Sequence, residues 1–191
     1  MRDEELAVGL AGDLDGHVEA LVLAYQNRLY AFAWRLTGSA QDAEEIAQDT
    51  FVHAYRALAR YPHEQVRTLA LRPWLYRIAL NVTRNRVRGT RLPVDHLDEV
   101  KHAAWTVDER ERPDEWLERA ERHDDLAALV ATLPERYRAA VVLRHVSGLS
   151  YHEMAAALGQ PEGTLKSNVH RALALLREAL KRRSEPVAAV R

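Results

Sequence analysis

The chain has 191 residues, of which 47% are hydrophobic, and its formal net charge is −1. This composition excludes a chain that is disordered throughout, and the length predicts one medium domain or two small ones. The absence of cysteine excludes a disulfide framework and a thiolate metal site. Because no long apolar run and no secretory leader pattern are present, we expect a soluble cytoplasmic protein without membrane insertion.

The nearly neutral total conceals three blocks of charge. Residues 65–94 contain seven arginines and no acidic residue, whereas residues 95–125 contain twelve acidic and five basic residues. From residue 163 to the end there are seven basic and two acidic residues. Blocks of this kind are typical of segments that bind a partner.

Apolar residues recur at intervals of three and four along the chain, which predicts an all-α protein. In the N-terminal part, Gly38 is a good helix end and Ser39 a good helix start. Pro73 suits the first position of a later helix, and residues 63–71 are expected to form a loop or a short turn. Together these signals predict one compact helical domain over residues 15–91, with helices over about 18–36, 39–61 and 73–89.

Residues 92–122 are acidic, sparsely apolar and interrupted by Pro93 and Pro113. A connection of this length without firm periodicity is too long for a loop inside a compact fold. We therefore expect a flexible acidic linker between two small helical domains.

Residues 123–183 predict a second helical domain. Two helices are separated at Pro134, and Ser150 with Glu153 forms the pattern of a capping box. The short helix that this box starts is expected to end at Gly159, and a long helix follows to about residue 183. A short helix, a tight turn and a longer helix are typical of a helix-turn-helix.

The long helix has one apolar face, and the opposite face carries small or hydrogen-bonding residues with Lys166 on its flank. Such residues suit a helix that lies in the major groove of DNA. The alternative is an ordinary helical hairpin with a solvated face. The candidate contacts are Gly163, Thr164, Lys166, Ser167, His170 and Arg171.

The segment RPWLYRIALNVTRNRVRGTR (72–91) contains six arginines around an apolar stripe. Phosphate contacts are the natural use of these arginines, and such binding falls steeply with salt. Aromatic rings can stack on exposed bases, and asparagines can pair with base edges. The alternative is that Trp74 and Tyr76 anchor the core and that the arginines form a solvated face.

Four motifs resemble bacterial sigma factors of the extracytoplasmic-function group, group 4 of the sigma-70 family. They occur in the family order and cover both domains: DAEEIAQDTFVHAYRAL (42–58), RPWLYRIALNVTRNRVR (72–88), LPERYRAAVVLRHVSGLSYHEMAAALG (133–159) and GTLKSNVHRALALLR (163–177). The resemblance implies a non-catalytic transcription initiation factor that binds core RNA polymerase and directs it to promoters. It implies recognition of −10 and −35 elements, capture of the melted non-template strand, and no metal or other cofactor.

The resemblance also assigns roles to single residues. An acidic face that binds the β′ clamp helices of the polymerase falls on Asp42, Glu45, Gln48 and Asp49, and the β flap is a second implied contact. Recognition of the −10 element falls on Arg72, Trp74, Arg77, Asn81, Arg84, Asn85 and Arg88. Recognition of the −35 element falls on Thr164, Lys166, Ser167, Asn168, His170 and Arg171. Asn85 stands where many members have aspartate, and Asn168 where arginine is common.

Two other classes of function compete with this interpretation. A self-sufficient regulator would bind duplex DNA through the helix-turn-helix alone, which leaves the acidic face at 42–49 unexplained. An enzyme finds little support, because no histidine pair is spaced by three or four along a helix and no H-E-x-x-H, P-loop or G-x-S-x-G pattern appears.

Two regulatory expectations remain. The resemblance implies an anti-sigma partner held between the two domains. The charge blocks suggest that the acidic linker (95–125) folds over the arginine-rich helix in the free protein and suppresses DNA binding.

Overall fold

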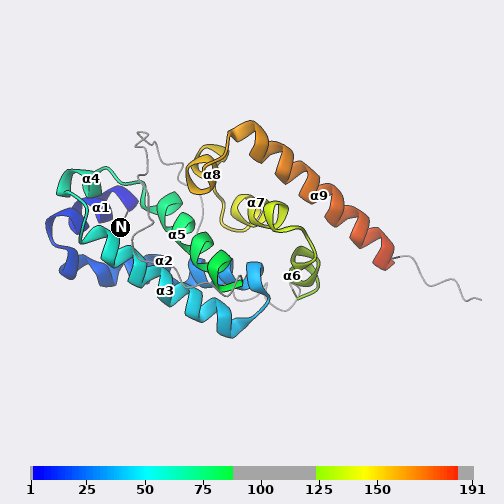
Figure 1. The fold of residues 1–191 in the computed structure, drawn as a ribbon, viewed down its shortest axis with the longest axis horizontal. Coiled ribbons are helices and arrows are strands. Elements are labelled where there is room, and N and C mark those ends of the chain that lie inside the picture. The colour runs from blue at the N-terminus through cyan, green and yellow to red at the C-terminus, as the bar shows by residue number, and fades with distance from the viewer. Residues whose placement is uncertain (1, 88–123, 185–191) are drawn as a thin grey trace, which may run out of the picture.

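The computed structural model describes residues 2–87 and 124–184, and every regular element in these two ranges is an α-helix. The predicted all-α class is therefore confirmed. The linker prediction concerns residues outside the described ranges. Figure 1 shows the arrangement of α1 (Asp3–Gly12), α2 (Leu14–Thr37), α3 (Ala40–Leu58), α4 (His63–Arg67), α5 (Leu71–Val87), α6 (Asp124–Ala131), α7 (Glu135–His145), α8 (Tyr151–Leu158) and α9 (Glu162–Ser184).

The turn between α2 and α3 follows the predicted local signals. Gly38 ends α2 with a left-handed backbone (φ 71°), which glycine adopts without steric cost. Ser39 begins α3, and its Oγ accepts a hydrogen bond of 3.2 Å from the backbone N–H of Asp42. This tight connection lets α2 and α3 pack along each other.

The N-terminal domain contains two helices that the sequence patterns did not predict. α1 precedes the expected domain start and packs on α2 and α4, where the hydroxyl of Tyr25 donates a 2.5 Å hydrogen bond to Asp3. α4 lies in the segment expected to be a loop or short turn, and the His63 ring contacts the carbonyl of Ala11. α5 begins two residues before Pro73, which is allowed because the first N–H groups of a helix have no intrahelical acceptor.

The C-terminal domain has the predicted helix-turn-helix. The Oγ of Ser150 accepts from the backbone N–H of Glu153 at 3.1 Å, and the Glu153 carboxylate accepts from the backbone N–H of Ser150 at 2.7 Å. Gly159 ends α8 in the left-handed region (φ 64°). The capping box and the short turn thus position α9 across α7 and α8.

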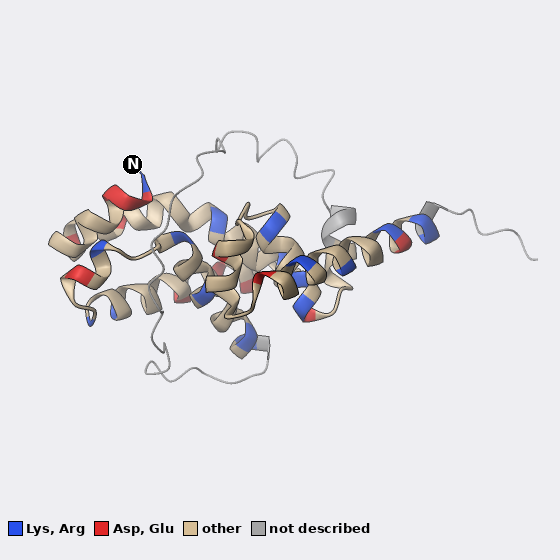
Figure 2. Ribbon diagram, turned by 90° about the horizontal axis from the view of Figure 1, so that it is seen from above, with Lys and Arg blue, Asp and Glu red and all other residues tan. Residues whose placement is uncertain are grey.

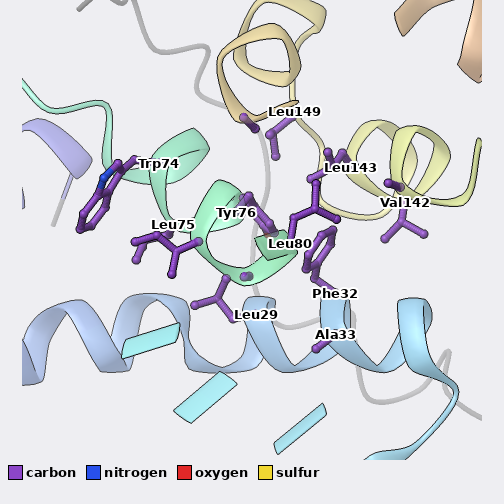
Figure 3. Close-up of a cluster of buried hydrophobic side chains, with 14 of the residues drawn as sticks. Leu29, Phe32, Ala33, Trp74, Leu75, Tyr76, Leu80, Val142, Leu143 and Leu149 are labelled. Atoms are coloured by element: carbon purple, nitrogen blue, oxygen red, sulfur yellow. The ribbon is translucent and has the colours of Figure 1, made fainter. Parts of the chain in front are cut away.

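One apolar cluster joins the two domains (Figure 3). Tyr76 of α5 meets Phe32 of α2 edge to face, with ring centroids 5.1 Å apart at 78°. Leu143 of α7 and Leu149 of the α7–α8 turn lie beside α5 and are fully buried. The arginine-rich helix is therefore packed between the N-terminal core and the helix-turn-helix.

A second contact between the domains is polar. Arg138 of α7 donates a 2.7 Å hydrogen bond to the carbonyl of Leu36, in the last turn of α2. It donates another of 2.6 Å to the carbonyl of Ala131. Carbonyls at the end of a helix lack intrahelical donors and carry partial negative charge. Arg138 consequently satisfies the end of α2 from the other domain.

Because the cluster is shared, we expect Leu149→Ala to lower the free energy of unfolding by about 2–5 kcal/mol, the range for large-to-small core substitutions. Leu175→Ala, at a position 37% exposed, is the matched control and should have a small effect. Urea unfolding followed by circular dichroism measures both. A Leu149→Ala variant as stable as the control would contradict the shared core.

Candidate nucleic-acid and polymerase interfaces

The arginines of α5 are held away from its buried stripe of Leu75, Ile78 and Ala79. Arg72 faces the C-terminal domain: one terminal nitrogen donates to the carbonyl of Ser147, and the other is 3.9 Å from Oε1 of Glu153. The Arg72 and Glu153 side chains are only 23% and 22% exposed. The two terminal nitrogens of Arg72 thus face acceptors of the C-terminal domain.

Two further arginines of α5 are paired with carboxylates from other helices. Arg84 Nε lies 2.7 Å from Glu135 Oε1 at the start of α7. Arg86 reaches α3, where Nε is 2.6 Å from Asp42 Oδ1 and Nη2 is 2.6 Å from Glu45 Oε2. The acidic residues that neutralise this helix therefore come from α3, α7 and α8.

The other predicted −10 residues are placed differently. Arg77 is half-buried and has no carboxylate partner among the described residues. Asn81 and Asn85 are partly exposed on α5, where their amides remain available to a ligand. Arg88 lies outside the described ranges.

Trp74 was assigned to the −10 element as a residue that could stack on a base, and the structure corrects this assignment. Its ring is 3% exposed and packs against Tyr61, with centroids 6.2 Å apart. The position follows from helical spacing, because Trp74 lies on the same stripe as Leu71 and Ile78, which are buried. In this arrangement Trp74 anchors the core and does not offer a face to a base.

The predicted polymerase-binding residues of α3 divide into two pairs. Gln48 and Asp49 are exposed, as expected. Asp42 and Glu45 are 39% and 41% exposed and both contact Arg86. The single exposed acidic face that the spacing predicted is therefore half neutralised by α5.

The electrostatics of this contact favour the charged forms. Hydrogen bonds from Arg86 and, to a smaller extent, from the Ser39 side chain hold the pKa of the Asp42 carboxyl below its usual range. The two carboxylates in turn raise the pKa of Arg86. Both shifts favour the charged forms of Asp42 and Arg86.

α9 presents most of its predicted DNA-reading residues to solvent. Thr164, Lys166, Ser167, His170 and Arg171 are exposed. The assignment of Asn168 to the −35 element is corrected, because this residue is only 8% exposed. It follows Leu165 by three positions and so falls on the buried stripe of α9. Figure 2 shows basic residues along the length of α9.

A basic hollow of about 630 Å³ lies between α7, α8 and α9. Tyr151 lines this hollow, and its ring contacts two cations there: Arg144 lies 5.1 Å and Lys166 5.5 Å from the ring centroid. Beside it, hydrogen bonds from Arg171 and Arg136 lower the pKa of Tyr137. The chemistry of this surface suits an anionic ligand such as a nucleic-acid backbone.

Other kinds of site find no support in the described ranges. Within residues 2–87 and 124–184, no group of three or more His, Asp or Glu side chains is arranged to hold a metal ion. None of the helices there combines the length and the apolarity that crossing a membrane requires.

Sequence reasoning missed the residues that pair with α5 from the second domain. Glu153 was recognised only as part of a capping box, and Glu135 carried no signal. The one available clue was the lack of acidic residues between 65 and 94, which shows that partners are needed but not where they lie.

Two family models match the chain, with the descriptions "Sigma-70 region 2" over residues 21–92 and "Sigma-70, region 4" over residues 123–176. The first match contains α3 and α5, and the second contains the helix-turn-helix.

Curated and solved relatives agree with these matches. The RNA polymerase sigma-H factor of Pseudomonas aeruginosa is 34% identical over 88% of this chain and 86% of its own. CnrH, solved in complex with the cytosolic domain of CnrY, has a TM-score of 0.70 at 25% identity, covering 95% of this chain and 99% of that one. The sigma factor RpoE of Bartonella quintana, solved with the anti-sigma factor NepR, has a TM-score of 0.59 at 28% identity, covering 85% and 96%.

The matched regions carry the α3 face, the arginine helix and the helix-turn-helix in one chain and in the order of the family. The ECF RNA polymerase sigma-E factor of Escherichia coli (strain K12) is 31% identical over 87% of this chain and 86% of its own. The chain belongs to the extracytoplasmic-function sigma factors of the sigma-70 family, and it is a transcription initiation factor that directs RNA polymerase to promoters.

Proposed function

We propose that this sigma factor binds core RNA polymerase through α3, recognises the −10 element through α5 and recognises the −35 element through α9. The observation that carries the proposal is the presence of three chemically distinct surfaces on one chain. They are an acidic face on α3, an arginine-rich helix and a basic helix-turn-helix. A duplex-binding regulator needs only the last of these.

On α3, the exposed pair Gln48 and Asp49 makes the first contact with polymerase. Asp42 and Glu45 join the interface once Arg86 leaves them, since both carboxylates are partly exposed. An acidic face of this kind complements a basic surface on the partner, which speeds the encounter and selects the partner.

On α5, the arginines hold the backbone of a single strand while Asn81 and Asn85 contact its bases. Opening a duplex costs roughly 1.4 kcal/mol per base-pair step, and extruding a base costs a few kcal/mol more. One helix does not supply this free energy alone. The polymerase must hold the DNA while α5 captures the exposed strand.

The packed arrangement of the domains is the state that precedes DNA binding. Arg72 and Arg84 are paired with Glu153 and Glu135, so phosphates must replace these carboxylates. α7 and α8 must therefore move away from α5 when promoter DNA binds. The predicted masking of α5 by residues 95–125 concerns a segment that lies outside the described ranges up to residue 123, and it remains a prediction.

A partner that holds the domains together would keep the protein inactive. CnrH was solved with a domain of CnrY and RpoE with an anti-sigma factor. We extend this to the present chain and propose an anti-sigma factor that stabilises the contact of α5 with α7 and α8. Contact with the β flap remains a proposal for the C-terminal domain.

The direct test is run-off transcription with core RNA polymerase of the source organism on genomic promoter fragments. We expect transcripts that start downstream of a shared pair of motifs only when the protein is added. Asn81→Ala should lower the yield without changing the unfolding midpoint, because the side chain is partly exposed. If no transcript starts and the protein alone retains particular duplex fragments, the regulator function replaces the proposal.

The exposed and buried residues of α9 give a second prediction, which concerns the affinity of the polymerase complex for promoter fragments. Arg171→Ala should weaken binding about tenfold and make it less sensitive to salt, as loss of one anchoring cation does. Asn168→Ala should instead lower the thermal stability, because Asn168 is buried. Competition binding at several salt concentrations and thermal unfolding separate the two effects. Equal losses of DNA affinity at unchanged stability would show that Asn168 reaches DNA.

A further inference from the structure

Arg86 joins the arginine helix to the acidic helix. It lies in the last turn of α5 and contacts both Asp42 and Glu45 at 2.6 Å. We refer to these three residues as the Arg86 cluster. Within the described residues, it connects the surface proposed for polymerase with the helix proposed for DNA.

The carboxylates of the cluster have few other cationic contacts. Glu45 Oε2 pairs with Arg86, while Glu45 Oε1 accepts 3.2 Å from the neutral amide of Gln41. Asp42 Oδ1 accepts from Arg86 Nε. The side chains of the cluster are 34–41% exposed, so a cation from another molecule can reach the carboxylates from solvent.

Separating the cluster costs little free energy. Ion pairs at exposed positions contribute little to stability, because water and salt screen the charges and both side chains lose conformational freedom. Asp42 remains in the first turn of α3 and Arg86 in the last turn of α5, where the helix dipoles favour their charges without the pair. Each partner therefore has a favourable place whether the cluster is closed or open.

We propose that Arg86 is an exchangeable cation that couples polymerase binding to DNA binding. A basic surface of the polymerase binds the carboxylates of Asp42 and Glu45, and the released Arg86 guanidinium binds a phosphate of the captured strand. The inference rests on the proposed function of α3 and α5. Since the two ligands compete with the same internal contact, each strengthens the binding of the other.

The first test measures the affinity for core polymerase without DNA. Arg86→Gln removes the internal competitor and should bind core polymerase about two- to fivefold more tightly at low salt, the range that exposed ion pairs reach. Arg77→Gln is the matched control, because it removes an arginine from the same helix that pairs with no described carboxylate. It should leave this affinity unchanged, and circular dichroism verifies that both variants fold.

The second test measures binding of a fluorescein-labelled single-stranded oligonucleotide to the free protein at low salt. Glu45→Gln frees Arg86 and should tighten binding about two- to fivefold. Glu44→Gln removes the same charge one residue away. Among the described residues Glu44 accepts from the neutral amide of Gln48, so this variant should gain less affinity for the oligonucleotide. When Arg86 is already replaced by Gln, Glu45→Gln should increase the affinity for the oligonucleotide no more than Glu44→Gln does.

Opposite outcomes overturn the exchange. Arg86→Gln that binds core polymerase no better than the wild type rejects it, and so does Glu45→Gln that gains no more DNA affinity than Glu44→Gln. These results leave the proposed function standing. If the wild type does not bind core polymerase at all, the proposed function fails and the exchange fails with it.

Discussion

The excess of positive charge on α5 is the constraint on which the rest of the structure depends. The helix must bury an apolar stripe between two domains, and its arginines must nevertheless stay ionised. Unpaired charges at a buried interface are costly, so each arginine near a neighbour needs an acceptor. The chain supplies these acceptors from Glu135, Glu153 and the Ser147 carbonyl, and from Asp42 and Glu45 on α3.

These internal partners occupy the positions that phosphates take in the proposed complex. The packed form is held by an apolar cluster as well as by ion pairs, and its polar contacts can be exchanged. In a promoter complex, new contacts to polymerase and DNA must offset the free energy lost when the apolar contact around Tyr76 and Leu149 opens. This requirement explains physically why a partner that clamps the domains would inhibit the protein.

Local signals predicted most of the helices, because helix caps and apolar spacing act over a few residues. The Gly38–Ser39 turn and the Ser150–Glu153 capping box are examples. Trp74 and Asn168 were assigned to DNA on residue type and family position, and both are buried in the structure. For Trp74 the burial agrees with the alternative of a core anchor, which the sequence had left open. The ion-pair partners of α5 could not be predicted, because they join residues 41 to 81 positions apart through tertiary packing.

The most direct test of this account is the distance between the two domains in the free and the bound protein. The chain has no cysteine, so Leu23→Cys on α2 and Leu175→Cys on α9, both at exposed positions, accept spin labels selectively. Electron paramagnetic resonance should give one narrow distance distribution for the free protein and a longer distance once core polymerase and promoter DNA are bound. The same short distance in the complex, or a broad and long distribution in the free protein, would contradict the central claim that α5 is neutralised internally and released to DNA.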